Sequence, residues 1–153
     1  MKKLFGIITI ATLLAVLSGN ALAGSKSAIM LATARVLPVA KHTILYQKSN
    51  FTVTEADIMK GFIDIPMAMV LSIRTNSVNG YLLLFSAKNE RFNELTVFDG
   101  DNAYKLSETG GEVHMPYENN NYITKELGFR FYLSPDFKPG TYQWPVAVMI
   151  TAI

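Results

Sequence analysis

The chain consists largely of short segments that alternate between apolar and polar residues and end at glycine, proline, asparagine or aspartate. In the segment 67–75, for example, Met69, Leu71 and Ile73 alternate with more polar neighbours. This period of two predicts a β-strand with one buried face, because successive side chains of a strand point to opposite faces. About eight or nine such strands predict an all-β protein, and their hairpin-like spacing favours an antiparallel, immunoglobulin-like β-sandwich over a closed barrel.

The first part of this strand series contains the best candidate for a helix. Strands are expected at 30–37, 42–46 and 50–54, where apolar, β-branched and aromatic residues predominate. A single helical turn is expected next, because Thr54 can act as its N-cap and acidic residues lie in its first turn. Gly61 would end this turn.

The turn sequences predict which strands are neighbours. An Asp-Gly-Asp-Asn turn suits a hairpin between strands at 94–98 and 103–106. A polar, glycine-containing turn predicts a second hairpin, between strands at 67–75 and 81–85. The amphipathic strand at 127–133 is expected to pair with the closing strand of the chain.

The N-terminal segment has the parts of a secretory signal peptide. Lys2-Lys3 precedes an apolar stretch, and Ala21-Leu-Ala23 then offers small residues at the two positions that a signal peptidase reads. The apolar stretch is shorter than the ~20 residues that a membrane-spanning helix needs, which argues against an anchor. We predict a signal peptide at 1–23 and a single domain at 24–153, in the periplasm or at the cell surface, with no transmembrane segment in the mature chain.

Charge and composition argue against several partners and chemistries. Of the 14 basic residues, Lys2 and Lys3 belong to the leader, so the mature chain carries 12 basic and 12 acidic residues. A neutral chain with scattered lysines and arginines has no concentrated positive charge to neutralise phosphates, which argues against a nucleic-acid partner. The chain has no cysteine, so thiol catalysis and thiolate metal sites are excluded.

The sequence contains no clear motif for catalysis or metal binding. His42 and His114 are its only histidines, and neither has a second histidine at metal-ligand spacing. There is no Gly-x-Ser-x-Gly elbow for a nucleophilic serine. Asp99 and Asp101 resemble a fragment of a calcium loop, but the glutamate that closes such a loop is missing, so a turn is the better interpretation. We therefore predict no enzyme activity and no cofactor.

Two tyrosines are candidates for ligand contact. Core and cross-strand packing explain most aromatic residues of the chain. Tyr117 and Tyr122 bracket the polar loop 118–121, and aromatic faces suit carbohydrate and peptide ligands. A self-contained periplasmic or surface binding domain, for carbohydrate or for another envelope protein, is therefore one functional hypothesis, and an envelope enzyme without an obvious motif is a weaker one.

The C-terminal segment begins with a Pro-Gly turn and stays apolar to its last residue. Five of its residues share one parity and would line one face of an extended strand: Tyr142, Trp144, Val146, Val148 and Ile150. That face must be buried, either in the protein or in a partner. Pro145 lacks an N–H group, so the start of the strand is expected at a sheet edge or a bulge, with full pairing only over 146–153.

The leader, the neutral all-β domain and the closing Pro139-Gly-Thr-Tyr142 segment resemble the pilin-type subunits of the chaperone–usher pathway, especially the archaic branch with spore-coat-U-like domains. In that family a Pro-Gly-Thr-Tyr segment introduces the last strand, and Gly140 lies fourteenth from the end, where many subunits place a glycine. The resemblance implies a non-enzymatic structural subunit of a bacterial surface fibre or coat. Its partners would be a periplasmic chaperone and like subunits, to which the closing strand would be presented.

The resemblance also implies a mechanism of assembly. Subunits of that family have an incomplete sandwich, whose open groove accepts an extended segment of a neighbour by β-strand addition. The donor would be the mature N-terminus. Its candidate buried faces are Ile29 and Leu31 on one parity, and Ala28, Met30, Ala32, Ala34 and Val36 on the other. The alternative is that residues 27–36 form the first strand of the domain's own sheet.

Overall fold

The computed structural model describes residues 33–88 and 92–153, and residues 36–153 form one structural unit. Strand accounts for 64% of the described residues and helix for 5%, so the prediction of an all-β protein is confirmed. The predicted signal peptide at 1–23 and the first part of the candidate donor segment, at 27–32, lie outside the described residues. No helix in the described part of the chain is long and apolar enough to cross a membrane.

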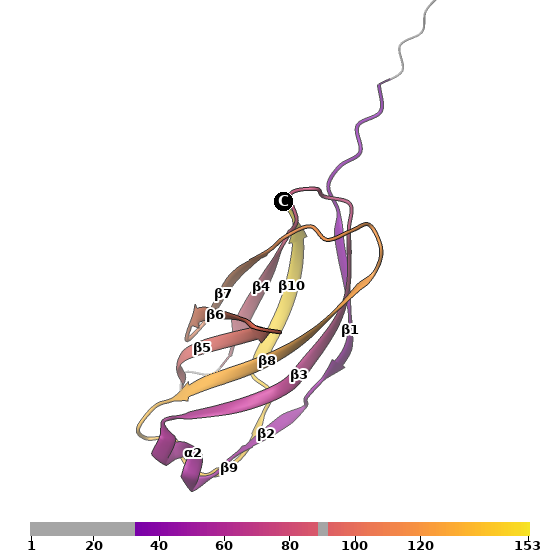
Figure 1. The fold of residues 1–153 in the computed structure, drawn as a ribbon. Coiled ribbons are helices and arrows are strands. Elements are labelled where there is room, and N and C mark those ends of the chain that lie inside the picture. Colours follow the sequence, from indigo (N-terminus) through magenta and orange to yellow (C-terminus); the bar gives the residue numbers. More distant parts are fainter. Residues whose placement is uncertain (1–32, 89–91) are drawn as a thin grey trace, which may run out of the picture. The chain divides into compact units, whose positions relative to one another are not determined.

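In the described part of the chain, strands follow one another with a single short helix, α2, between the second and the third (Figure 1). The elements are β1 (Ala40–Gln47), β2 (Asn50–Val53), α2 (Glu55–Lys60), β3 (Phe62–Thr75), β4 (Tyr81–Ala87), β5 (Phe92–Asp99), β6 (Asn102–Ser107), β7 (Gly110–Met115), β8 (Ile123–Leu133), β9 (Gly140–Gln143) and β10 (Val146–Ala152). The predicted order of strands and of the helical turn is therefore largely right from residue 40 onward.

Eight of these strands form one antiparallel sheet, in the order β1-β3-β8-β5-β6-β7-β4-β10. The other two, β2 and β9, pair with each other. The large sheet curls until its two end strands, β1 and β10, approach each other, so that it nearly closes into a barrel (Figure 1). The predicted antiparallel class is confirmed.

The predicted strand neighbours are right in one case and wrong in two. β5 and β6 pair across the Asp-Gly-Asp-Asn turn, as predicted. β3 and β4 do not form a hairpin, because β3 pairs with β1 and β8 whereas β4 pairs with β7 and β10. β8 pairs with β3 and β5, and not with the closing strand. The loop after β3 therefore connects two strands that are far apart in the sheet order, and it is not a hairpin turn.

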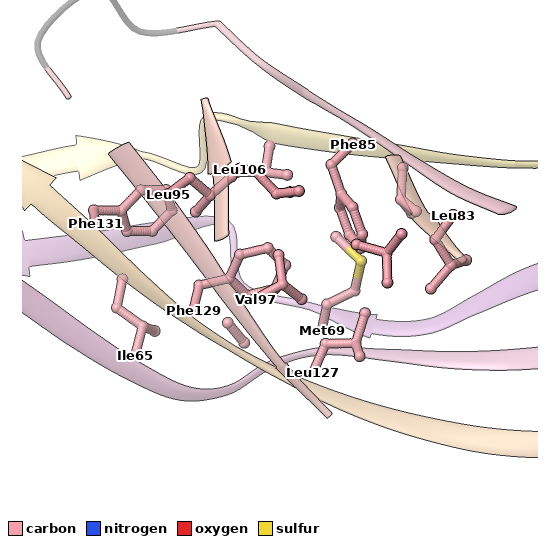
Figure 2. Packing of buried hydrophobic residues seen from close by; sticks show 14 of the residues in the cluster. Ile65, Met69, Leu83, Phe85, Leu95, Val97, Leu106, Leu127, Phe129 and Phe131 are labelled. Atoms are coloured by element: carbon pink, nitrogen blue, oxygen red, sulfur yellow. The ribbon is translucent and has the colours of Figure 1, made fainter. Parts of the chain in front are cut away.

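The core lies inside the curled sheet and is centred on β8. Leu127, Phe129, Phe131 and Leu133 alternate along this strand and are all buried, as the period of two predicts. Figure 2 shows Phe129 and Phe131 packed with side chains from several strands, including Leu95 and Val97 of β5, Met69 of β3 and Phe85 of β4. The middle of the chain therefore supplies the core against which the two end strands pack.

The helical turn α2 is held by a capping box at its start. The Thr54 side chain accepts a hydrogen bond from the Asp57 backbone N–H at 3.2 Å, and the Asp57 carboxylate accepts one from the Thr54 N–H at 3.0 Å. These bonds satisfy N–H groups that have no partner within the helix. At the other end, Gly61 adopts a left-handed conformation with φ of 80°, as expected for the glycine that ends a helix.

This cap predicts an acid-sensitive contribution to stability. Hydrogen bonds from the side chain and backbone of Thr54 hold the pKa of Asp57 below its usual value of 3.8. A carboxylate with a lowered pKa stabilises the fold above its unfolded-state pKa, and this contribution disappears as the pH falls through the folded-state pKa. We expect Asp57→Asn to lower the free energy of unfolding by roughly 0.3–1 kcal/mol at pH 7.

The difference between wild type and Asp57→Asn should shrink in urea titrations as the pH falls through the lowered pKa of Asp57, and it should vanish once the wild-type carboxylate is protonated in the folded state as well. Glu55→Gln is the matched control, because Glu55 lies in the same first turn but has no part in the capping box. A pH-independent deficit in Asp57→Asn would contradict the role assigned to the charge.

Candidate functional site

The two end strands of the large sheet, β1 and β10, have one paired edge each. β1 pairs with β3 and β10 pairs with β4. Within 33–88 and 92–153, no strand pairs with the other edge of either one, although the two strands lie near each other (Figure 1). We call these two free edges, Ala40–Ile44 of β1 and Val148–Ala152 of β10, the seam.

The seam is closed at one end. β2 continues the chain beyond β1, β9 precedes β10, and these two short strands pair over their whole length. Next to them, the Trp144 N–H donates to the Ser49 carbonyl at 2.9 Å, and the Gln47 side chain donates to the Val146 carbonyl at 3.5 Å. The direct contacts across the seam are therefore concentrated at the β2–β9 end.

On β1, residues that face the core remain accessible. Residues directly opposite each other in an antiparallel ladder lie on the same face of the sheet. His42 lies opposite Ile73, and Ile44 lies opposite Leu71. Ile73 and Leu71 are fully buried, yet Ile44 is 43% exposed and His42 is only half-buried. The core-facing side of β1 is therefore incompletely covered along the seam.

β10 shows the same loss of burial along its length. Val146 and Val148 are buried, whereas Ile150, two residues further on, is only partly buried. Ile150 lies opposite Leu83, which is almost completely buried, so it points toward the core as well. Both end strands thus leave core-facing apolar side chains incompletely covered, away from the end that β2 and β9 close.

The chain's own core buries most of the face formed by Tyr142, Trp144, Val146, Val148 and Ile150. Tyr142 stacks on Phe51 with ring centroids 5.8 Å apart, and Trp144 contacts Phe129 edge-on at 5.1 Å. Pro145 lies in the break between β9 and β10, and continuous pairing starts at Val146, as predicted. A partner at this strand would therefore meet its free backbone edge, and not the buried valine side chains.

The segment that precedes β1 belongs to no strand. Residues 33–39 form no strand, so the strand predicted at 30–37 is wrong for 33–37, and Ala34 and Val36 are exposed. The physical reason lies in Asn76, whose side chain accepts a hydrogen bond from the Val39 N–H at 2.6 Å and donates one to the Leu37 carbonyl at 3.1 Å. The Asn76 side chain thus forms hydrogen bonds with the backbone groups on either side of Pro38, which would otherwise be available to a neighbouring strand. Of the other candidate donor residues, Ile29, Met30, Leu31 and Ala32 lie outside the described residues.

Both ends of the 36–153 unit meet beside the open end of the seam. The Ile153 N–H donates to the Gly80 carbonyl at 3.4 Å, and the Ser77 hydroxyl donates to the Ile153 carbonyl. Val36, Leu37 and Ile153 line the same shallow cavity of about 300 Å³. The candidate donor segment therefore joins the domain next to the place where the seam is open.

The two candidate ligand-contact tyrosines, Tyr117 and Tyr122, lie in different environments. The Tyr117 hydroxyl donates to the Asn120 side chain at 3.0 Å and so stabilises the loop 118–121. Tyr122 is 63% exposed and lines a surface cavity with Arg74, whose guanidinium carbon lies 5.6 Å from the centre of its ring. The Tyr122 ring is therefore accessible from solvent, whereas the Tyr117 hydroxyl is engaged within the loop.

One polar cluster was not predicted from the sequence. The Lys125 ammonium group of β8 lies 3.0 Å from Asp99 and 2.8 Å from Glu118, which ties the loop 118–121 to the sheet. Burial alone would lower the pKa of Lys125, but its hydrogen bonds to Glu118 and Asp99 outweigh this effect and raise it. Burial also raises the pKa of the nearby Tyr81 to about 12. Asp99 is thus engaged in an ion pair, and the register of β5 and β8, which creates this pair, is not visible in the sequence.

The two histidines lie on strands that are not neighbours in the sheet, His42 on β1 and His114 on β7. Among the described residues, no group of three or more His, Cys, Asp or Glu side chains is arranged to hold a metal ion.

No protein-family model, curated protein or solved structure matches this chain. Its function is therefore inferred from the seam and from the loops at its open end.

Proposed function

We propose that the chain is a structural subunit of a bacterial surface fibre or coat, and that it assembles by β-strand addition into the seam. The supporting observation is the exposure of Ile44 and the partial exposure of Ile150, core-facing residues on two strands whose free edges lack a partner within the described residues. An inserted strand would pair with both edges and cover these side chains. In this proposal the curled sheet is an immunoglobulin-like sandwich that lacks one strand.

The direction of the end strands determines how an inserted strand can pair. Each step in the sheet order reverses strand direction, so β1 and β10, at the two ends of eight strands, run antiparallel to each other. A strand inserted between them must be parallel to one and antiparallel to the other. Both kinds of ladder satisfy backbone N–H and C=O groups, so insertion would complete the sheet in either orientation.

The attachment point of the N-terminal segment, at Val36, supports donation to a neighbour. The segment joins β1 beside the open end of the seam, and exposed Val36 continues its apolar pattern up to the domain. A donor that leaves one subunit and fills the seam of the next makes a head-to-tail contact, and repeated contacts of this kind form a fibre. A periplasmic chaperone would hold the same free edges before assembly.

The test uses two forms of the protein, residues 24–153 and residues 36–153, and a peptide of residues 25–36. We expect the longer form to form oligomers and the shorter one to be monomeric in size-exclusion chromatography. The peptide should raise the melting temperature of the shorter form by roughly 10 °C at a concentration about 100 times its Kd, because a ligand that binds only the folded state stabilises it.

Matched variants of β10 locate the binding site. Ile150→Asp places a charge on the core-facing side of the seam and should abolish stabilisation by the peptide. Met149→Asp is the control, because Met149 is 63% exposed on the opposite face of the same strand. Peptides with aspartate at 29 and 31, or at 30 and 32, show which parity of the donor is buried. Only the peptide with aspartate on the buried parity should fail to raise the melting temperature of the shorter form.

Two results would contradict the proposal. A monomeric 24–153 form that is no more stable than 36–153, and a short form indifferent to the peptide, would show that the seam needs no strand and would favour a self-contained binding domain. A monomeric 24–153 form that is more stable than 36–153 would show that the segment fills its own seam, which corresponds to the alternative of a first strand in the domain's own sheet.

A further inference from the structure

Two cations lie directly opposite each other near the open end of the seam. Lys41 of β1 is paired in register with Arg74 of β3, and both side chains are exposed on the outer face of the sheet. Like charges at directly opposite positions of an antiparallel ladder repel each other and destabilise the sheet. None of the ion pairs between described residues includes Lys41 or Arg74, so no described carboxylate compensates this repulsion. An external anion bound between the two cations would do so.

An aromatic ring lies beside this pair of cations. A cavity of about 230 Å³ is lined by Val39, Lys41, Arg74, Thr75, Asn76 and Tyr122. The guanidinium of Arg74 lies over the Tyr122 ring, and the remaining surface of the ring is largely exposed to solvent. An exposed aromatic face next to cationic donors combines an apolar platform with charge-assisted hydrogen bonding.

The loop that carries Tyr122 is held in place before any ligand binds. Arg74 Nε donates to the Asn120 carbonyl at 3.0 Å, which leaves the terminal N–H groups of the guanidinium for a ligand. The Tyr117 hydroxyl donates to the Asn120 side chain, and Lys125 pairs with Glu118 at the start of the loop. A site whose geometry is fixed in advance loses less entropy when it binds.

From this arrangement we propose that the cavity binds an acidic saccharide. The sugar ring would lie against Tyr122, and its carboxylate would lie between Lys41 and Arg74. A sugar ring suits the platform because its C–H face is apolar, while its hydroxyl groups would face the polar side chains that line the cavity, among them Asn76. The side chains of this site lie on the outer face of β1 and β3, whereas strand addition would use the free backbone edge of β1 and cover its core-facing side chains.

The test compares matched ligands by isothermal titration calorimetry with the purified protein at low ionic strength. We expect binding of a galacturonic acid tetrasaccharide, and no detectable binding of a galactose tetrasaccharide or of sodium acetate at the same concentration. Lys41→Gln, Arg74→Gln and Tyr122→Ala should each weaken binding about tenfold or more, the amount expected for loss of a charge-assisted hydrogen bond or a stacking contact. Lys105→Gln is the control, because Lys105 is an exposed lysine of β6 outside the cavity.

Several outcomes would overturn the proposal. Equal affinity for the galactose tetrasaccharide would show that the cations take no part in recognition. Equal affinity for acetate would show an anion site without a sugar platform, and equal or tighter binding of an Asp-rich peptide would assign the site to acidic peptides. An unchanged affinity in Tyr122→Ala or Arg74→Gln would place the bound saccharide elsewhere, and absence of binding to the acidic tetrasaccharide would exclude the site.

Discussion

Replacement of Phe131 by alanine is expected to lower the free energy of unfolding by about 3–5 kcal/mol, the usual cost of removing a fully buried aromatic side chain. Phe131 has no exposed surface, and its ring centroid lies 4.6 Å from that of Phe92 and 5.6 Å from that of Phe51. These neighbours come from different strands, β5 and β2, so the cavity left by the substitution would loosen both the large sheet and the β2–β9 pair.

Urea titration followed by circular dichroism measures this loss, and the fluorescence of Trp144 gives a second readout, since it is the single tryptophan and its ring lies 5.7 Å from that of Phe131. Tyr122→Ala is the control, because Tyr122 is mostly exposed, and we expect its effect to stay within about 0.5 kcal/mol. A loss below about 1 kcal/mol in Phe131→Ala would contradict the placement of β8 at the centre of the core.

The second large effect is expected for Gly110→Ala, at the start of β7. Gly110 has φ of +110°, and a Cβ atom added there would lie 2.1 Å from the carbonyl oxygen of Phe85 in β4. The backbone of β4 cannot move away without breaking its ladders to β7 and β10. Strain at positive φ and displacement of packed backbone together predict a loss of roughly 2–5 kcal/mol in the free energy of unfolding.

Gly100→Ala separates these two causes. Gly100 also has positive φ, of +57°, but a Cβ atom there meets no atom within 4 Å. Its replacement should therefore cost only the backbone strain, about 1 kcal/mol after allowance for the lower entropy of the unfolded chain. Equal losses for the two variants in parallel thermal unfolding experiments would show that the close approach of β7 to β4 is not what makes Gly110 necessary.

Local sequence signals predicted the elements of this fold well, because each depends on a few consecutive residues. The Asp-Gly-Asp-Asn turn gives the β5–β6 hairpin, and the Thr54 cap and Gly61 give the two ends of α2. The alternation along β8 gives its buried face. In all three cases the residues that specify the structure lie within one turn or one strand.

The strand neighbours were harder to predict, since they depend on how the sheet curls. The turn after β3 has the composition of a hairpin turn, but β8 and β1 occupy the two edges of β3, so β4 must pair elsewhere. The start of β3 was also missed, since the strand was expected at 67–75 and β3 begins at Phe62. The ladder to β8 skips from Ile65 to Met69, and this bulge accommodates both Pro66 and the positive φ of Met67.

The candidate sites were predictable only in part, for the same reason. The exposed aromatic ring of Tyr122 could be proposed from its position beside a polar loop. Its partners could not, because Lys41 and Arg74 are brought together by the register of β1 on β3. The exposure of Ile44 likewise depends on the absence of a described strand beside β1, and no local pattern reveals an edge.

The sheet order also has a consequence for the sequence of folding events. β5, β6 and β7 follow one another along the chain and are neighbours in the sheet, so this part can form early. β4 lies between β7 and β10, and one edge of β4 stays bare until the last strand is available. A chain that stopped before Val146 would leave Leu83 and Phe85 beside a free edge, in a state prone to aggregation. Completion of the β4 ladder therefore requires β10, the last strand of the sheet to be synthesised.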